Sequence, residues 1–189
     1  MTPKKWWHFL VLFGLVCGMA AAALGALSIT LIYPTLPSLE IITDYKPVQP
    51  LRIYSADGYL IGEFGEERRA FTKIEDIPEQ MQAAVLAIED RRFYTHGGVD
   101  FKGILRAIRN NLLGRSHEGA STITMQVAKN FFSGPSRKRN IITKIKESLL
   151  AIKIEKTLTK DQILELYLNQ IYLGQRSYGF AAASQVYFA

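Results

Sequence analysis

The chain has 189 residues, which is enough for one domain or slightly more. Its formal charge is +6 at pH 7 and its isoelectric point is about 9.4, so an anionic partner such as a membrane surface, a phosphate group or a nucleic acid is favoured. The single cysteine, Cys17, excludes a disulfide framework and a cysteine-based metal site. The three histidines are scattered and never stand at the spacing of metal ligands.

The first predicted element is a transmembrane helix from Phe9 to Ile32, which contains no charged residue. A Lys-Lys pair precedes it and no lysine or arginine follows until Lys46, so we expect residues 1–8 to be a cytoplasmic tail. A cleaved signal peptide is the alternative, because Ala20 to Ala23 supply small residues for a cleavage site. The apolar run continues beyond them, which favours an uncleaved anchor. Both interpretations place the body outside the cytoplasm and argue against a nucleic-acid partner.

Residues 33–50 contain four of the seven prolines and are predicted to be a linker. Two strand-like runs, residues 51–54 and 59–64, flank Asp57-Gly58 and predict a β-hairpin. The charged run from Glu66 to Arg69 is predicted to be solvated.

A helix is predicted next, ending near Glu89, and its apolar residues recur at the spacing of one buried face: Met81, Ala84, Val85 and Ile88. Glu89 lies at the edge of that face, where partial desolvation would make it a candidate general base. The alternative is a helix that merely ends in solvated charges, with Gly97-Gly98 as its stop.

Residues 101–113 form a basic amphipathic segment. It is either an ordinary surface helix or, in a protein tethered to a bilayer, a helix resting in the lipid interface. In the next segment, from Gly119 to Asn130, small and hydroxyl residues lead into a helix. Its first N–H groups, with Ser121 and Thr122, could cradle a phosphate group. N-capping by one of these hydroxyls is the alternative.

A helix from about Asn140 to Lys156 is apolar on most sides and is predicted to be central. Glu147 on this helix is a candidate buried carboxylate, and a surface ion pair with Lys144 is the alternative. A capping box at Thr159 starts the following helix, and Gly174 is expected just past its end. A last apolar stretch stops at residue 189 without a cap, which suggests a truncated domain.

Taken together, five ordered blocks resemble the peptidoglycan glycosyltransferases of family 51, which form the membrane-anchored N-terminal half of class A penicillin-binding proteins. The resemblance covers about residues 51–189, and residues 52–69 are closer to the bifunctional members than to the monofunctional ones. The blocks are Glu89-Asp90-x-x-Phe93-x-x-His96-x-Gly98; Gly119-Ala120-Ser121-Thr122-Ile123-Thr124-x-Gln126 with Lys129-Asn130; Lys144-x-x-Glu147; Glu165-x-Tyr167-Leu168-Asn169-x-Ile171-Tyr172-x-Gly174; and Gly179-Phe180-Ala181-Ala182-Ala183 with Tyr187-Phe188.

The resemblance implies a mainly α fold: a lysozyme-like glycosyltransferase domain at residues 51–189, C-terminally incomplete, with a small membrane-associated lobe and a short N-terminal β-hairpin. This domain would follow one transmembrane helix, at residues 9–32, of a single-pass protein of the bacterial inner membrane, with the catalytic domain on the periplasmic face. The implied activity is polymerisation of lipid II into glycan strands, with inversion and release of undecaprenyl pyrophosphate. Implied partners are lipid II, the growing glycan chain, the membrane and other cell-wall synthesis proteins.

The resemblance also assigns roles to residues. Glu89 matches the general base that takes a proton from the acceptor sugar, and Glu147 matches a second glutamate that positions substrate or assists the leaving pyrophosphate. Lys129 and Arg139 match basic residues that face the pyrophosphate. Asp90, Phe93 and His96 are expected chiefly to hold Glu89 and the following loop. The other residues matched to substrate-binding positions are Ser121, Thr122, Gln126, Lys144 and Asn169.

A divalent cation, Mg²⁺ or Mn²⁺, is implied by the family, although no ligand cluster is visible in the sequence. Two departures from the family pattern are Met125, where glutamine is usual, and Thr143, where arginine is usual. Neither Ser-x-x-Lys nor Lys-Thr-Gly occurs, so this chain has no transpeptidase site. Two alternative functions are an inactive membrane-anchored fragment with a scaffolding role and a lysozyme-like hydrolase that uses the two carboxylates. The basic groups between the glutamates favour a pyrophosphate leaving group over hydrolysis.

Overall fold

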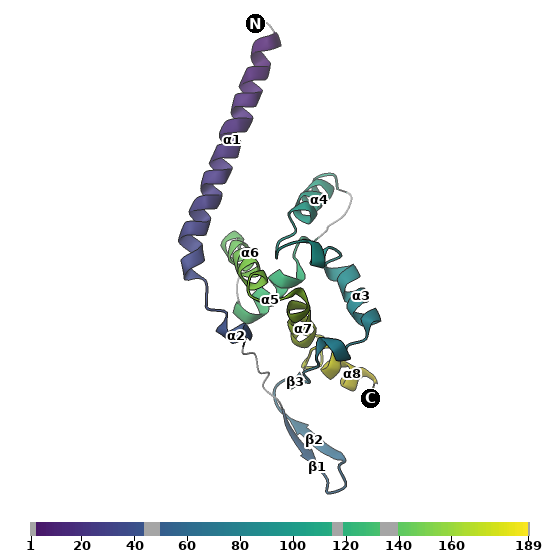
Figure 1. Ribbon diagram of the computed structural model, residues 1–189. Coiled ribbons are helices and arrows are strands. Elements are labelled where there is room, and N and C mark those ends of the chain that lie inside the picture. Colours follow the sequence, from purple (N-terminus) through teal and green to yellow (C-terminus); the bar gives the residue numbers. More distant parts are fainter. Residues whose placement is uncertain (1–2, 44–49, 115–118, 133–139, 189) are drawn as a thin grey trace. The chain divides into compact units, whose positions relative to one another are not determined.

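The structure is a computed structural model that describes residues 3–43, 50–114, 119–132 and 140–188 (Figure 1). It divides into two units, residues 1–37 and residues 38–189. The first unit is helix α1, Pro3–Ile32, followed by the single turn η1, Tyr33–Thr35. Within the stretch Trp6–Thr35, an 18-residue window has a mean hydropathy of 2.4, and the stretch is long and apolar enough to cross a membrane, a test that a signal sequence also passes. The predicted N-terminal helix is therefore confirmed.

The second unit is mostly helical, which confirms the predicted mainly α class. Its elements are α2 (Glu40–Thr43), β1 (Leu51–Tyr54), β2 (Leu60–Phe64), β3 (Arg68–Arg69), η2 (Ile74–Asp76), α3 (Glu79–Glu89), η3 (Phe93–Thr95), α4 (Phe101–Leu112), α5 (Ile123–Phe132), α6 (Ile141–Glu155), α7 (Lys160–Gln170), β4 (Ser177–Tyr178) and α8 (Phe180–Phe188). The helices predicted over residues 101–113 and 140–156 are thus present within one residue of the expected bounds.

Helix α5 lies at the centre of this unit and packs against both α6 and α7 (Figure 1). The buried side chains come from facing positions of the three helices, among them Ile123, Val127, Ala128, Leu150, Ala151, Ile154, Ile163, Leu164, Tyr167 and Leu168. One face of α7, with Ile163, Leu164, Tyr167 and Leu168, is therefore part of the core. Helix α6 is buried against α5 from Glu147 onward, whereas Ile141 and Ile142 in its first turn are exposed. The predicted central position of α6 therefore holds except at its first turn.

The two small sheets differ in how far apart their paired strands lie in the sequence. Strands β1 and β2 form the predicted antiparallel hairpin, with Gly58 at a φ of 84° in its turn. Strand β3 pairs in parallel with β4, and the guanidinium of Arg69 lies 4.2 Å from the centre of the Tyr178 ring. Arg68 and Arg69 are half-buried, so the expectation that residues 66–69 are solvated was wrong for these two. Local sequence could not show this, because their partner strand lies more than a hundred residues away.

Helix α7 begins with the predicted capping box, in which the Thr159 and Gln162 side chains and backbones bond reciprocally. It ends at Gln170, with Ile171 as an extended C-cap residue, so Gly174 is not the residue that stops it. Gly174, at a φ of 90°, instead opens a turn closed by a hydrogen bond from the Ser177 N–H to its carbonyl. This turn leads directly into β4.

Asn169, near the end of α7, fixes the segment that leads into α3. Its Oδ1 accepts the Thr72 N–H at 2.8 Å, and its Nδ2 donates to the Thr72 carbonyl at 2.8 Å. One turn earlier, Glu165 Oε2 accepts the Ile74 N–H at 2.8 Å. Helix α7 therefore sets where α3 begins, and α3 carries Glu89.

The loop between α3 and α4 passes directly over the backbone of α6. Gly98 has a φ of 91°, and a Cβ added to it would lie 2.8 Å from the carbonyl carbon and oxygen of Ala151. The Gly98 carbonyl also accepts a hydrogen bond from Thr122 Oγ1 at 2.6 Å. Only glycine combines this φ with so close an approach.

We expect Gly98→Ala to lower the free energy of unfolding by about 1–3 kcal/mol, because the new methyl group meets backbone that cannot move aside at a strained φ. Gly97→Ala is the matched control, since a Cβ there meets nothing within 4 Å and the φ is not in the left-handed region. Thermal unfolding of the two variants in detergent measures the difference. Equal melting temperatures would contradict the close approach.

Asp100 caps α4 and pairs with Arg92. Its carboxylate accepts the Gly103 N–H at 2.9 Å and the Arg92 Nε–H at 3.0 Å. Burial raises the pKa of Asp100, but the hydrogen bonds from Gly103 and Arg92 and the charge of Arg92 outweigh it and hold the pKa below its ordinary value of 3.8.

A depressed carboxyl pKa stabilises the fold above the pKa of the unfolded chain, and this contribution is lost as the pH falls through the folded pKa. Wild type should therefore lose stability from about pH 3.8 downward. Asp100→Asn keeps a good capping side chain but removes the charge, so its melting temperature should fall less over the same interval. Thermal unfolding between pH 6 and pH 3 tests this, and parallel curves would show that Asp100 does not contribute.

Candidate active site

Glu89 is the last residue of α3, and its carboxylate faces solvent. Gln126 on α5 donates from Nε2 to Glu89 Oε2 at 2.8 Å. The expected desolvation of Glu89 is not found, because Ala84 and Ile88 on the predicted buried face are exposed, Ile88 by 82%. Helical periodicity identifies such a face but cannot say whether another element covers it.

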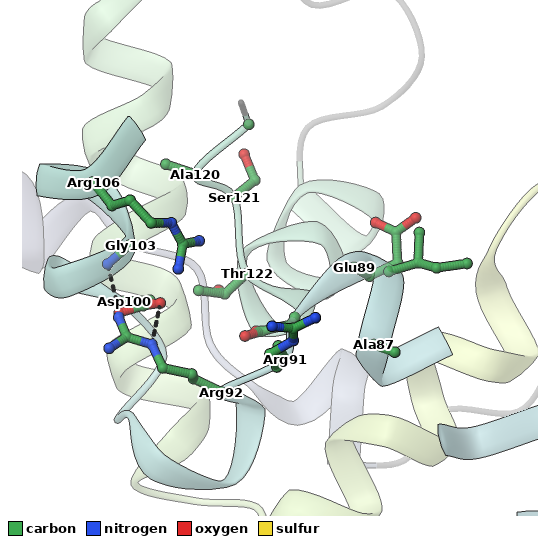
Figure 2. Close-up of a pocket in the computed structure, with 13 residues that line it drawn as sticks. Ala87, Glu89, Arg91, Arg92, Asp100, Gly103, Arg106, Ala120, Ser121 and Thr122 are labelled. Carbon is green, nitrogen blue, oxygen red and sulfur yellow. Dashed lines mark hydrogen bonds and ion pairs between the residues drawn. The ribbon is translucent and has the colours of Figure 1, made fainter. Parts of the chain in front are cut away.

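A cavity of about 490 Å³ opens beside Glu89, between the end of α3, helix α4 and the segment before α5 (Figure 2). Ile88 lines it, so the exposed apolar side chain belongs to this cavity. Three carboxylates and three guanidinium groups share the lining: Glu89, Asp90 and Asp100 with Arg91, Arg92 and Arg106. Figure 2 shows Arg106 extending from α4 toward Ser121 and Thr122. Neither Arg91 nor the cavity role of Arg106 was predicted, because a charge just after a helix, or in the middle of one, does not show that the side chain lines a cavity.

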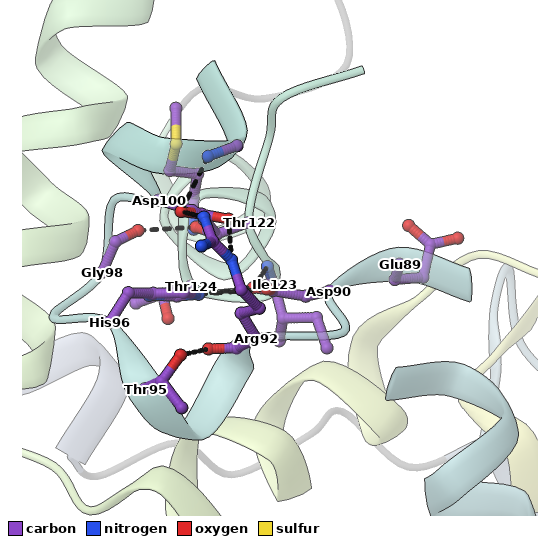
Figure 3. Close-up of polar contacts among 12 residues, drawn as sticks. Glu89, Asp90, Arg92, Thr95, His96, Gly98, Asp100, Thr122, Ile123 and Thr124 are labelled. Atoms are coloured by element: carbon purple, nitrogen blue, oxygen red, sulfur yellow. Dashed lines mark hydrogen bonds and ion pairs between the residues drawn. The ribbon is translucent and has the colours of Figure 1, made fainter. Parts of the chain in front are cut away.

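Asp90 is buried and joins three segments. His96 Nε2 lies 2.9 and 3.0 Å from its two oxygens, and the Ile123 N–H donates to Asp90 Oδ2 at 3.1 Å (Figure 3). The carboxylate therefore binds the start of α5 as well as the loop after α3. Phe93 is fully buried beneath this loop. These contacts fit the expected holding role of Asp90, Phe93 and His96.

Glu147 is buried on α6, as expected of a candidate carboxylate, and is only 7% exposed. Lys144 Nζ lies 3.1 Å from Glu147 Oε2 and donates to Ser121 Oγ at 2.7 Å. Both interpretations of this pair are therefore correct: the i,i+3 ion pair exists, and Glu147 is buried. Lys144 itself is half exposed, so its ammonium can also meet a ligand.

Thr122 caps the start of α5. Its Oγ1 accepts the Met125 N–H at 3.1 Å and donates to the Gly98 carbonyl, so the capping alternative is confirmed for this residue. Ser121 contacts the Lys144–Glu147 pair, and Gln126 contacts Glu89. The short segment from 121 to 126 thus connects the surroundings of the two glutamates.

The two departures from the family pattern occupy positions away from the cavity. Met125 is buried in an apolar cluster with Val99 and Ala151, where a thioether is accommodated without a hydrogen-bond partner. Thr143 lies in the first turn of α6, and its N–H donates to the capping side chain of Asn140 at 2.7 Å.

The remaining predicted residues lie in different places. Lys129 is exposed near the end of α5, on the same helix as Gln126. Arg139 lies outside the described residues. Asn169 is buried near the end of α7, with its amide engaged by the backbone of Thr72 and Glu165, so the structure does not bring it to the two glutamates.

Tyr167 on α7 belongs to one of the five matched blocks, but no role was predicted for it. It is 1% exposed, and its hydroxyl has no hydrogen-bond partner among the described residues. Burial, and after it the negative charge of Glu89, raise the pKa of this hydroxyl well above its ordinary value. The side chain therefore lies within electrostatic reach of Glu89.

No group of three or more His, Cys, Asp or Glu side chains that could hold a metal ion occurs in the part of the chain that the structure describes. The steps proposed below use only side chains of this protein.

Comparison of the sequence with known proteins identifies its family. Residues 57–189 match the sequence model of the transglycosylase family. Penicillin-binding protein 1A of Neisseria lactamica is 55% identical over 179 residues, which cover 93% of this chain and 22% of the relative. Penicillin-binding protein 1A of Escherichia coli is 50% identical over 183 residues, covering 94% and 21%. The chain therefore spans about a fifth of the length of these relatives. Since the family model covers most of its length, this chain belongs to the transglycosylases, glycosyltransferase family 51.

Proposed function

We propose that this chain polymerises lipid II into glycan strands and releases undecaprenyl pyrophosphate. The observation that carries the proposal is the placement of two glutamates, one exposed and one buried, around a single hydroxyl- and amide-bearing segment. The membership of the transglycosylase family supports the same chemistry.

Glu89 acts as the general base. Its carboxylate accepts the proton of the acceptor sugar's 4-hydroxyl while that oxygen attacks the anomeric carbon of the donor chain. The bond from that carbon to the pyrophosphate oxygen breaks, so the configuration inverts and the lipid pyrophosphate leaves with the bonding electrons. The hydrogen bond from Gln126 engages one carboxylate oxygen and orients the other for proton transfer.

The Lys144–Glu147 pair serves the leaving group. Lys144 is held between Glu147 and Ser121 by contacts of 3.1 and 2.7 Å, so its ammonium has a fixed position before substrate arrives. A preorganised cation offsets the negative charge that develops on the pyrophosphate. Lys129, exposed on α5, and Arg139 would add to this positive surface. Any divalent cation at the pyrophosphate stays a prediction from the family.

The lipid part of the substrate requires a membrane. Helix α4 exposes a row of large apolar side chains next to basic ones, namely Phe101, Leu105, Ile108 and Leu112 with Lys102 and Arg109. A helix of this kind lies in the lipid interface. We propose that α4 rests there, that α1 is the anchor, and that the N-terminus is cytoplasmic, since the Lys-Lys pair precedes the apolar run.

The test of the base is Glu89→Gln, assayed with fluorescent lipid II and detergent-solubilised protein. The amide cannot accept the proton, so the initial polymerisation rate should fall by about 10²–10⁴-fold. Glu79→Gln is the matched control, because Glu79 is exposed in the first turn of the same helix and should leave the rate unchanged.

Three outcomes of this experiment would contradict the proposal. Full activity of Glu89→Gln would show that Glu89 is not the general base. Failure of wild type to form polymer would favour a scaffolding role. Release of sugar fragments from finished peptidoglycan, without polymer from lipid II, would favour a lysozyme-like hydrolase.

Lys144→Met tests the leaving-group role. Loss of the ammonium leaves the buried Glu147 carboxylate without its cation, so we expect a lower melting temperature as well as a fall in kcat of about 10²–10³-fold. Lys146→Met, two residues along the same helix, is the control and should retain the wild-type rate. Steady-state kinetics on lipid II decide the matter, and a normal kcat in Lys144→Met would show that this ammonium does not meet developing charge.

A further inference from the structure

Lys160, the first residue of α7, makes contacts with two other parts of the fold. Its Nζ donates to Glu155 Oε1 on α6 at 2.7 Å and to the His96 carbonyl at 2.7 Å. The same Nζ lies 4.4 Å from the centre of the Phe93 ring, a cation–π distance. The side chain is 20% exposed, so these contacts are made largely out of water.

Glu155 ties this ammonium to the central helix. Its side chain is 9% exposed, and Oε1 also accepts the hydroxyl of Thr124 on α5 at 2.7 Å. Helices α5, α6 and α7 therefore meet at one carboxylate oxygen. Among the contacts described here, it is Lys160 and not Glu155 that continues to the loop after α3.

The loop connects Lys160 with Glu89 in few steps. Lys160 holds the carbonyl of His96, whose ring binds the carboxylate of Asp90. Asp90 is the residue directly after Glu89 and also accepts the Ile123 N–H. A shift of the His96 carbonyl would therefore also shift the His96 ring and the Asp90 carboxylate that it binds. Asp90 directly follows the last residue of α3, so the end of that helix would move as well.

We propose that Lys160 is a positioning residue for the glycosyl transfer: its ammonium clamps the loop through His96 and Phe93 and so sets the place of Glu89. The inference rests on the proposed function of Glu89. A displacement of about 1 Å at a catalytic group can cost about 10²-fold in rate, so the clamp acts on kcat. Substrate affinity should change little, because Lys160 touches no residue assigned to pyrophosphate binding.

A purely structural role of the ion pair makes a different prediction. Removing one partner of a buried pair leaves an uncompensated charge and destabilises the protein, whereas removing both charges restores much of the stability. If Lys160 served stability alone, activity would return together with stability in the double variant. If Lys160 clamps the loop, activity stays low in every variant that lacks the ammonium.

The experiment compares Lys160→Met, Glu155→Gln and the double variant with wild type, using thermal unfolding and steady-state kinetics on lipid II. Glutamine at 155 can still accept the Thr124 hydroxyl. We expect each single variant to melt below the double variant. We expect kcat to fall about 10–100-fold in Lys160→Met and in the double variant, with KM within about 3-fold, and to stay within about 3-fold of wild type in Glu155→Gln.

Recovery of kcat along with stability in the double variant would overturn the proposal, as would a normal kcat in Lys160→Met. Should Lys160→Met fail to fold, the double variant still decides. Hydrogen exchange of residues 93–98 gives a readout independent of activity. It should quicken in both variants that lack Lys160 and not in Glu155→Gln, and unchanged exchange would also refute the clamp. If wild type makes no polymer, but hydrogen exchange quickens only in the variants that lack Lys160, the proposed function is wrong and the tethering of the loop by Lys160 is supported.

Discussion

The buried carboxylate of Asp90 is the contact on which the site depends. It accepts the first N–H of α5 from Ile123 and binds the ring of His96, so it joins the end of α3, the start of α5 and the intervening loop. A carboxylate at a helix N-terminus is favourably placed, because unpaired N–H groups and the helix dipole both attract negative charge. This contact ties the residue directly after Glu89 to the start of α5, the same helix from which Gln126 donates to Glu89.

Around that carboxylate, the site is built from one loop, tethered at several points, and three packed helices. Gly98 lets the loop touch the backbone of α6, and Thr122 holds its carbonyl. Lys160 holds the loop from α7. The two glutamates therefore sit in contrasting environments: Glu89 faces the cavity and solvent, whereas Glu147 is buried with Lys144 as its partner. An exposed carboxylate suits proton acceptance from an incoming sugar, and a buried ion pair suits the fixed placement of a cation.

Much of this arrangement could be predicted from local sequence. The capping box at Thr159, the hairpin around Gly58 and the uncharged helix α1 depend on near neighbours, so their signals are complete within a few residues. The burial of Glu147 was also predicted, because the helix around it is so apolar. The predicted buried face of α3 failed at Ile88, since burial needs a second element and periodicity names none.

By itself the sequence determined the family and indicated two glutamates as candidates for the site, since both depend on five short blocks whose residues are close together in the chain. Only the tertiary structure decided which residues far apart in the sequence contact one another. It paired Arg69 with Tyr178, gave Asn169 to the backbone of Thr72, and brought Lys160 to the carbonyl of His96, 64 residues earlier. Contacts over such separations depend on how helices pack, and no local pattern encodes them.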